Sequence, residues 1–168
     1  LKKYRFPVRI DDSKKLTPRQ RESAFQAIFE SAFVGIGSVA PERIDRVNIF
    51  QASRIAMEEA LRKLGVEPDL LLIDGNIPVQ SPHERKCILH GDARSMSIAA
   101  ASIVAKVTRD RLMVAYDRKY PQYGFIRHKG YATEEHLTAL KKYGPSPIHR
   151  KTFRPLSLMR VPPHADID

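Results

Sequence analysis

The sequence has 168 residues, a length that suits one domain with a substantial buried core. Its formal net charge is +10, and the excess lies in the second half: residues 1–80 contain 13 Lys and Arg against 11 Asp and Glu, and residues 81–168 contain 16 against 8. This excess favours a polyanionic partner such as nucleic acid, with solubility alone as the alternative. The single cysteine, Cys87, excludes an internal disulfide, and no apolar stretch approaches about 18 residues, so we expect a cytoplasmic protein without a membrane segment.

The order of the predicted elements is typical of an α/β fold. Thr17 and Pro18 provide an N-cap and a first helical residue, and Asn48 is predicted to cap a later helix that Gly65 ends. The continuous apolar run at 69–75 is typical of a strand that is covered on both faces. Hydrophobic periodicity predicts helices at 17–31, 41–46 and 49–64, and strands at 33–39, 69–75 and 86–89, the last of them buried.

A helix rich in small residues is predicted after the last strand, with Asp92 before it and Asp110 within it. The simple interpretation of its alanine run, Ala99 to Ala101, is core packing. The functional interpretation is that close packing brings Asp110 near Asp92. A straight helix from Ser95 to Asp110 is about 22 Å long. If this helix began beside Asp92, the two carboxylates could not share a site. Residues 92–97 must therefore lead the chain away, so that the helix can return towards Asp92.

The C-terminal third combines basic loops with aromatic residues. Residues 120–125 end the long helix, 128–133 form a basic loop, and Thr133 caps a helix that ends near Gly144. The chain then becomes basic and extended at 146–153. His128, His136 and His149 lack the spacing of a zinc site, so we expect them at the surface or in contact with phosphates.

Carboxylates beside a basic surface indicate one kind of chemistry. Oxygen ligands favour Mg²⁺ or Mn²⁺, and carboxylates in a basic groove suit metal-assisted phosphodiester hydrolysis. An ordinary helix cap or ion pair is the alternative role for each of Asp74, Asp92 and Asp110.

Eight short motifs resemble bacterial ribonuclease HII. They occur in the family's order and cover nearly the whole chain, so that together they are specific although each is weak alone. The motifs are Asp12-Ser13-Lys14-Lys15-Leu16, Asn48-Ile49, Asp74-Gly75-Asn76, Gly91-Asp92, Ala99-Ala100-Ala101-Ser102-Ile103, Ala105-Lys106-Val107-Thr108-Arg109-Asp110, His128-Lys129-Gly130-Tyr131 and Pro147-Ile148-His149-Arg150.

The resemblance implies a single ribonuclease-H-like domain over residues 1–168. Its fold is a mixed five-stranded sheet flanked by helices, with a C-terminal helical extension from about residue 120. It also implies a monomeric endonuclease that uses Mg²⁺ or Mn²⁺ in two-metal-ion hydrolysis. Such enzymes cut the RNA strand of RNA–DNA hybrids, and cut at single ribonucleotides embedded in duplex DNA, leaving a 3′-hydroxyl and a 5′-phosphate.

The resemblance also assigns roles to individual residues. Asp92 matches the third of four family carboxylates and is a metal ligand, and Asp110 matches the fourth. Tyr131 matches the aromatic residue that stacks on the sugar beside the scissile junction. The predicted nucleic-acid contacts are Ser13, Lys14, Lys15, Arg94, Lys129, Tyr131, His149 and Arg150.

One family motif has no counterpart in the sequence. The family opens with a strand that ends in Asp-Glu-Ala-Gly-Arg-Gly and supplies the first two carboxylates. We therefore expect an N-terminally incomplete domain with three of the five strands, an exposed sheet edge and no activity as an isolated chain. The alternative is a non-catalytic nucleic-acid-binding module of the same fold.

Overall fold

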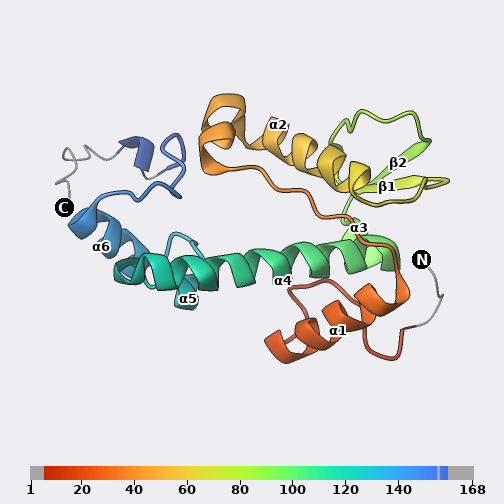
Figure 1. Ribbon diagram of the computed structural model, residues 1–168, viewed down its shortest axis with the longest axis horizontal. Helices are drawn as coiled ribbons and strands as arrows, with labels where there is room; N and C mark the ends of the chain where they lie inside the picture. The colour runs from red at the N-terminus through yellow and green to blue at the C-terminus, as the bar shows by residue number, and fades with distance from the viewer. Residues whose placement is uncertain (1–5, 155, 159–168) are drawn as a thin grey trace. The chain divides into compact units, whose positions relative to one another are not determined.

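The computed structural model describes residues 6–154 and 156–158 of the chain. These residues form two compact units, one from residues before Ala40 together with Phe50–Thr108, the other from Ala40–Ile49 together with residues after Thr108. The elements, labelled in Figure 1, are α1 (Pro18–Ser31), α2 (Pro41–Arg62), β1 (Leu71–Asp74), β2 (Arg85–Ile88), α3 (Gly91–Arg94), α4 (Met96–Lys119), η1 (Pro121–Tyr123), α5 (Phe125–His128), α6 (Glu134–Tyr143) and η2 (Leu156–Leu158).

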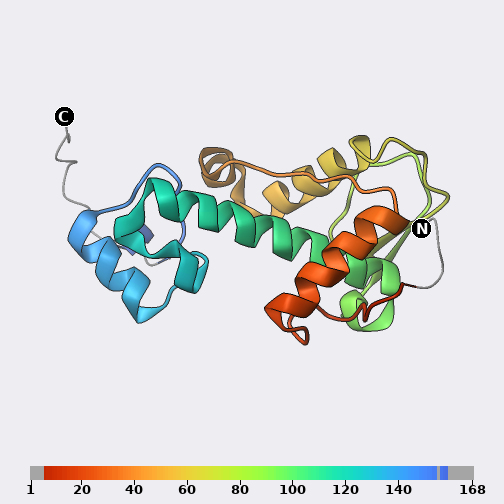
Figure 2. The same cartoon turned by 60° about the horizontal axis from the view of Figure 1, so that its bottom comes forward.

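The core of the first unit lies between α1 and the first half of α4, which run close together in Figure 2. The predicted capping of α1 is confirmed: Thr17 accepts a hydrogen bond from the Gln20 backbone, and the Gln20 side chain accepts one from the Thr17 backbone. Core packing also explains part of the alanine run, since Ala99 and Ala100 are buried whereas Ala101 is exposed. The buried cluster consists of Leu16, Ala24, Ile28, Ala32, Ala100, Ile103, Val104 and Val107.

The sheet of the described residues has two strands, β1 and β2, which pair in parallel from Leu71–Arg85 to Asp74–Ile88. The α/β class is confirmed, but a two-stranded parallel sheet stands where the resemblance implied a mixed one. The prediction that both strands are buried is wrong: only Ile73 is buried in them, Cys87 is exposed, and Leu89 is 64% exposed. Apolar composition predicts burial only where helices cover both faces of a sheet. The exposed residues of β1 and β2 show that this two-stranded sheet is not covered on both faces.

The predicted strand at 33–39 is not a strand in the structure. This segment is extended but packs on α2, where a Cβ on Gly35 would overlap the Ala60 carbonyl and a Cβ on Gly37 would overlap that of Ala56. The glycines that alternate with apolar residues thus allow this segment to lie directly against the backbone of α2. Glu59 on that helix accepts a hydrogen bond from the Ser38 N–H, a group that a neighbouring strand would otherwise pair.

The predicted break between two helices at Asn48 is confirmed. Within α2, Asn48 has φ 69° and ψ 168°, a non-helical conformation, so one helical segment precedes it and a second follows. Asparagine accepts positive φ more readily than most residues. Gly65, which follows the second segment, has φ 74°, as a helix-ending glycine does.

The second unit has its own core, formed where α4 continues past Thr108 and is followed by η1, α5 and α6. The predicted end of α4 before Pro121 and the predicted Thr133 cap of α6 are both confirmed. No helix among the described residues is long and apolar enough to span a bilayer. The buried cluster contains Met113, Tyr123, Phe125, Ala139, Leu140 and Leu156.

Candidate functional site

Two carboxylates follow the ends of the parallel strands in the first unit. Asp74 is the last residue of β1, and its Oδ1 accepts a hydrogen bond from the Gly91 N–H at 2.8 Å. Gly91 is buried, with the Ile98 side chain where a Cβ would lie. Asp74 therefore fixes the backbone from which Asp92, half-buried in α3, projects. Arg94 is exposed at the end of the same turn.

The chain does not pass directly from Asp92 into the long helix. Ser95, with φ −135° and ψ 123°, interrupts the helical path between α3 and α4. The break is one residue long, and Ile98 in the first turn of α4 packs against Gly91, so α4 begins beside α3 and residues 92–97 do not lead the chain away as expected. Asp110 lies further along α4, in the second unit, and is half-buried. That Asp92 and Asp110 bind neighbouring metal ions remains a prediction.

The resemblance implies a divalent-metal site with several carboxylate ligands. Between residues 6 and 158, leaving aside residue 155, no group of three His, Cys, Asp or Glu side chains is arranged to hold a metal ion. A stable divalent site with protein oxygen ligands needs several such groups. These residues therefore do not make a complete metal site on their own.

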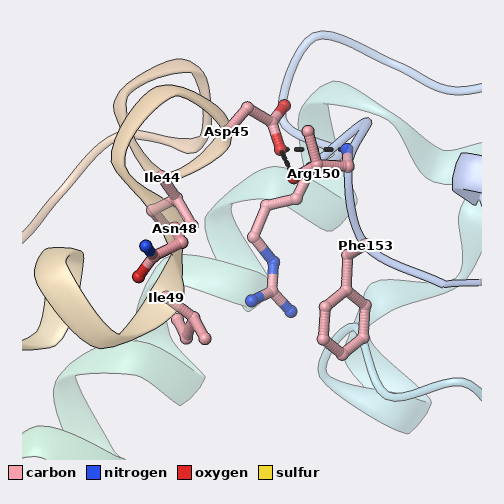
Figure 3. Close-up of a pocket in the computed structure, with 7 residues that line it drawn as sticks. Ile44, Asp45, Asn48, Ile49, Arg150 and Phe153 are labelled. Carbon is pink, nitrogen blue, oxygen red and sulfur yellow. Dashed lines mark hydrogen bonds between the residues drawn. The ribbon is translucent and has the colours of Figure 1, made fainter.

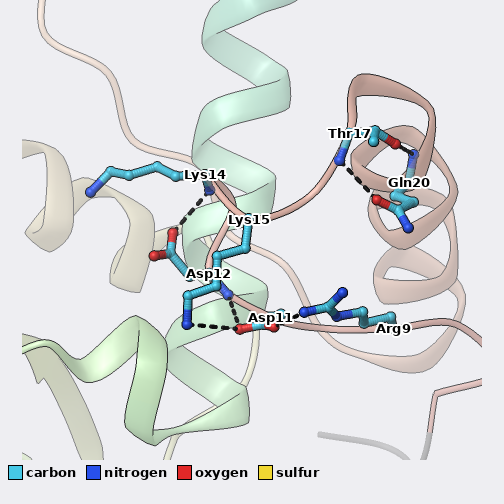
Figure 4. Close-up of polar contacts among 7 residues, drawn as sticks. All are labelled: Arg9, Asp11, Asp12, Lys14, Lys15, Thr17 and Gln20. Carbon is cyan, nitrogen blue, oxygen red and sulfur yellow. Dashed lines mark hydrogen bonds and ion pairs between the residues drawn. The ribbon is translucent and has the colours of Figure 1, made fainter.

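The loop before α1 presents two lysines from a tight turn (Figure 4). Asp12 closes this turn: its Oδ1 accepts from the Lys14 N–H at 2.9 Å and its carbonyl from the Lys15 N–H. The Lys14 side chain extends away from the turn, and Lys15 lies 3.9 Å from Asp11. A hydrogen bond from Arg9, followed by one from the Asp12 backbone, holds the pKa of Asp11 below its usual value.

Ser13 in this loop departs from its predicted role. Its side chain is buried, and its Oγ lies 3.0 Å from the Ser102 Oγ in α4. The Ser13 carbonyl also accepts a hydrogen bond from Arg21. The serine hydroxyl thus anchors the turn to the first core, whereas Lys14 and Lys15 beside it are exposed.

The second unit presents an aromatic and basic turn after α5. Tyr131 is 59% exposed, and the Arg109 guanidinium carbon lies 5.3 Å from the centre of its ring. Arg109 also donates a hydrogen bond to the Lys129 carbonyl at 2.8 Å, and Lys129 adopts φ 51°. Arg109 is not among the predicted contacts, although it directly precedes Asp110 in one of the family-like motifs.

Arg150 lies in a cleft of about 290 Å³ within the second unit (Figure 3). Its guanidinium carbon is 4.1 Å from the centre of the Phe153 ring, and Figure 3 shows the group between Ile49 and Phe153. Burial, and next the charge of Arg109, lower the pKa of Arg150. The negative charge of Asp45 acts in the opposite direction and raises it. The remaining lining residues are Ile44, Asp45, Asn48 and Thr152.

Asp45 holds the turn that carries Arg150. Its carboxylate accepts hydrogen bonds from the N–H groups of Lys151 and Thr152 at 2.8 and 3.1 Å, and from the Thr152 hydroxyl at 2.6 Å. Burial acts to raise the pKa of Asp45, but the hydrogen bonds from Thr152 and Lys151 outweigh it, and the pKa lies below its usual value. The arginine therefore projects from a turn with fixed backbone geometry.

The expectation that His128, His136 and His149 lie at the surface is wrong, because all three are buried in the second core. His149 was predicted to contact nucleic acid, yet its Nε2 lies 3.0 Å from His136 Nε2 and its Nδ1 accepts from the Ser146 N–H. A histidine with both ring nitrogens engaged inside the protein has none left to offer a phosphate.

The architecture defines this protein as a member of the ribonuclease-H-like α/β class. It is similar to the crystal structure of the ribonuclease H2 from Pyrococcus horikoshii OT3, with a TM-score of 0.69 and 26% identity, over 89% of this chain and 79% of that one. The Ribonuclease HII family profile matches residues 6–156. The chain belongs to the ribonuclease HII family.

Bacterial relatives extend this result. The chain is 53% identical to the ribonuclease HII of Lactobacillus helveticus over 152 residues. This alignment covers 89% of this chain and 60% of that protein. It is 53% identical over 146 residues to that of Geobacter sulfurreducens, with coverages of 86% and 67%. The chain thus spans about three fifths to two thirds of the length of these relatives.

Proposed function

We propose that the full-length protein carrying this chain is an endonuclease that hydrolyses the RNA strand of RNA–DNA hybrids. It also cuts at single ribonucleotides embedded in duplex DNA and leaves a 3′-hydroxyl and a 5′-phosphate. The observation that supports this most directly is the family match over residues 6–156, which includes every predicted contact residue. The protein acts as a monomer in the cytoplasm, in keeping with its single free cysteine, Cys87.

Asp92 and Asp110 are proposed as two of the carboxylates of a divalent-metal site. Both stand in motifs that match the family, and both are half-buried. Mg²⁺ or Mn²⁺ would supply activation of the attacking water when bound. Asp74 acts on Asp92 indirectly, since it holds the Gly91 backbone.

Nucleic acid is proposed to bind through phosphates at the lysine turn and the arginine cleft. Lys14 and Lys15 are exposed on a closed turn. Arg150 has a planar guanidinium, stacked on Phe153, which suits bidentate recognition of phosphate. Tyr131 offers an exposed ring for stacking on a sugar or base, beside Arg109. Affinity should fall with salt, with a log–log slope of about −0.9 per phosphate contact on B-DNA.

The test is incision of an end-labelled DNA duplex that carries one ribonucleotide, with Mg²⁺ or Mn²⁺ added. Full-length protein should cut the labelled strand beside the ribonucleotide. Asp92→Asn should abolish cleavage while binding persists, and Glu30→Gln, at an exposed position of α1, should leave cleavage unchanged. Full cleavage by the Asp92→Asn variant would overturn the proposed role of Asp92.

The same assay on the 168-residue chain tests the expectation that it is inactive by itself. Robust cleavage by this chain would mean that Asp74 or another acid supplies the missing ligands. A non-catalytic nucleic-acid-binding module is the second candidate, because the described residues lack a group of three metal-ligating side chains. That candidate predicts salt-dependent binding by the full-length protein without cleavage under either metal.

A further inference from the structure

The proposed function makes no use of the most unusual feature of the second core, its three buried histidines. They come from α5, α6 and the loop after α6. The rings of His128 and His136 stack with centroids 4.4 Å apart, and those of His136 and His149 are 5.3 Å apart. The fully buried Phe125 lies against all three. Buried polar groups of this kind are stable only when their hydrogen bonds are satisfied.

The hydrogen bonds of His149 and His136 determine where each proton lies. Two groups of Ser146 lie against His149 Nδ1: the backbone N–H, which can only donate, at 3.0 Å, and the hydroxyl oxygen, which can donate or accept, at 2.8 Å. Because the N–H donates to Nδ1, that nitrogen carries no proton, and the hydroxyl must donate to it as well. A neutral His149 then has its proton on Nε2 and donates to His136 Nε2 at 3.0 Å. His136 in turn keeps its proton on Nδ1 and donates to the Tyr131 carbonyl at 2.9 Å.

His128 follows the same logic beside this chain of bonds. Its Nδ1 accepts from the Gly130 N–H at 3.2 Å, so its proton lies on Nε2, which donates to the Tyr123 carbonyl at 2.8 Å. Each of the three imidazoles therefore has one tautomer that satisfies all its partners. Each of these tautomers is neutral.

We propose that His136 and His149 are positioning residues, which set Tyr131 and Arg150 against the nucleic acid through an ordered hydrogen-bond relay from Ser146 to the Tyr131 carbonyl. The proposal rests on the proposed function. Tyr131 lies in the irregular segment between α5 and α6, where its N–H donates to the His128 carbonyl and its carbonyl accepts from the Thr133 N–H. The bond from His136 to the same carbonyl adds a link from this turn to a buried side chain. Arg150 directly follows His149, whose ring is pinned at both nitrogens.

An added proton would disrupt the relay at either ring. On His149 it would occupy Nδ1 and oppose the Ser146 N–H, and on His136 it would occupy Nε2 and oppose the proton from His149. The titratable groups that face the pair are His128 from α5 and Tyr123 from η1, and at the edge of the same core Tyr116 and Tyr120 from α4.

The surroundings keep the relay neutral at pH 7. Burial, and next the charge of His136, lower the pKa of His149 from 6.5 to about 4. Burial also lowers the pKa of His136, against the effect of its bond to the Tyr131 carbonyl. Both rings are therefore neutral at pH 7, as the relay requires.

The first measurement is the tautomeric state of full-length protein with ¹⁵N-labelled histidine, by long-range ¹H–¹⁵N correlation at pH 7. We expect the proton of His149 on Nε2 and that of His136 on Nδ1. His83→Gln, which removes a histidine paired with Glu67 in the first unit, should leave these signals in place. The opposite tautomers, or a charged ring at pH 7, would overturn the proton order.

The second measurement is a double-mutant cycle on affinity for a duplex with one ribonucleotide. His136→Phe keeps a ring but removes the bond to Tyr131, and it should weaken binding about tenfold. In the Tyr131→Ala background the same change should cost less than twofold, because its effect passes through Tyr131. An equal loss in both backgrounds, or none in either, would overturn the positioning role.

Variants at His149 complete the design. Gln places an amide N–H near the position of Nε2, so His149→Gln should recover most of the affinity that His149→Phe loses. Equal affinities of these two variants would count against the relay. Thermal unfolding of each variant separates lost folding from lost binding. Failure of wild-type protein to bind the duplex would refute both the proposed function and the positioning role. The tautomer measurement does not depend on binding, so it would still test the proposed proton positions on His149 and His136.

Discussion

Acidification from pH 7 to pH 4.5 should destabilise the second unit, mainly through His149. The pKa of this ring is about 4 in the folded protein and about 6.5 when unfolded. Between these values the unfolded chain binds a proton that the folded chain does not. The free energy of unfolding is therefore highest above pH 6.5, falls as the pH drops from 6.5 towards 4, and changes no further through this group below that.

The magnitude follows from the difference between the two pKa values. Each pKa unit corresponds to about 1.4 kcal/mol, so His149 contributes on the order of 3 kcal/mol over the whole interval, at a slope of about 1.4 kcal/mol per pH unit. His136 acts in the same direction. The lowered pKa of Asp45 affects stability only as the pH falls below about 4, so the window from 6.5 to 4.5 reports mainly on histidine.

The assay is hydrogen exchange of the amides of α6 and of the loop that follows it, from pH 7.5 to 4.5, with rates corrected for intrinsic pH dependence. His149→Asn should flatten the profile, because its Oδ1 still accepts from the Ser146 N–H but does not titrate. His83→Gln should keep the wild-type slope. Identical slopes in wild type and His149→Asn would refute the assignment of the effect to His149.

Three further predictions concern packing and the arginine turn. Gly37→Ala should lower the free energy of unfolding in urea by several kcal/mol, because its Cβ overlaps the Ala56 carbonyl; Gly65→Ala, in open space but at φ 74°, should cost only about 1 kcal/mol, and equal losses would contradict the packing argument. Ile103→Ala, at a fully buried position, should cost about 2–5 kcal/mol in the same assay; a cost below about 1 kcal/mol would place it outside the core. Asp45→Asn should weaken duplex binding severalfold in fluorescence anisotropy, because an amide has one acceptor oxygen for a turn that uses two; unchanged affinity would separate the turn from binding.

Local signals in the sequence determined several elements of this protein. Thr17 and Thr133 cap helices as predicted, Asn48 stands at the predicted break between two helical segments, and Gly65 has positive φ a few residues after α2 ends at Arg62. These features depend on hydrogen bonds and dihedral angles within a few residues, so the sequence specifies them without knowledge of the fold. The family was evident in the same way, because motif order is a property of the sequence itself.

Candidate site residues were predictable by type and less so by exposure. Lys14, Lys15 and Tyr131 are exposed, as a contact with nucleic acid requires. Ser13 and His149 are buried instead, since each is held by a group distant in sequence or across a loop. A motif gives the identity of a residue, whereas its burial depends on what packs over it.

The tertiary structure alone decided the remaining features. The segment 33–39 alternates like a strand, yet its glycines allow it to lie on the backbone of α2. His128, His136 and His149 have a spacing without local meaning, and they meet only because α5, α6 and the loop after α6 surround one core. Periodicity in the sequence indicates which side of an element is apolar, but not which other element covers that side. Contacts between distant segments, and the proton positions on the three histidines that depend on them, are therefore decided only in the folded chain.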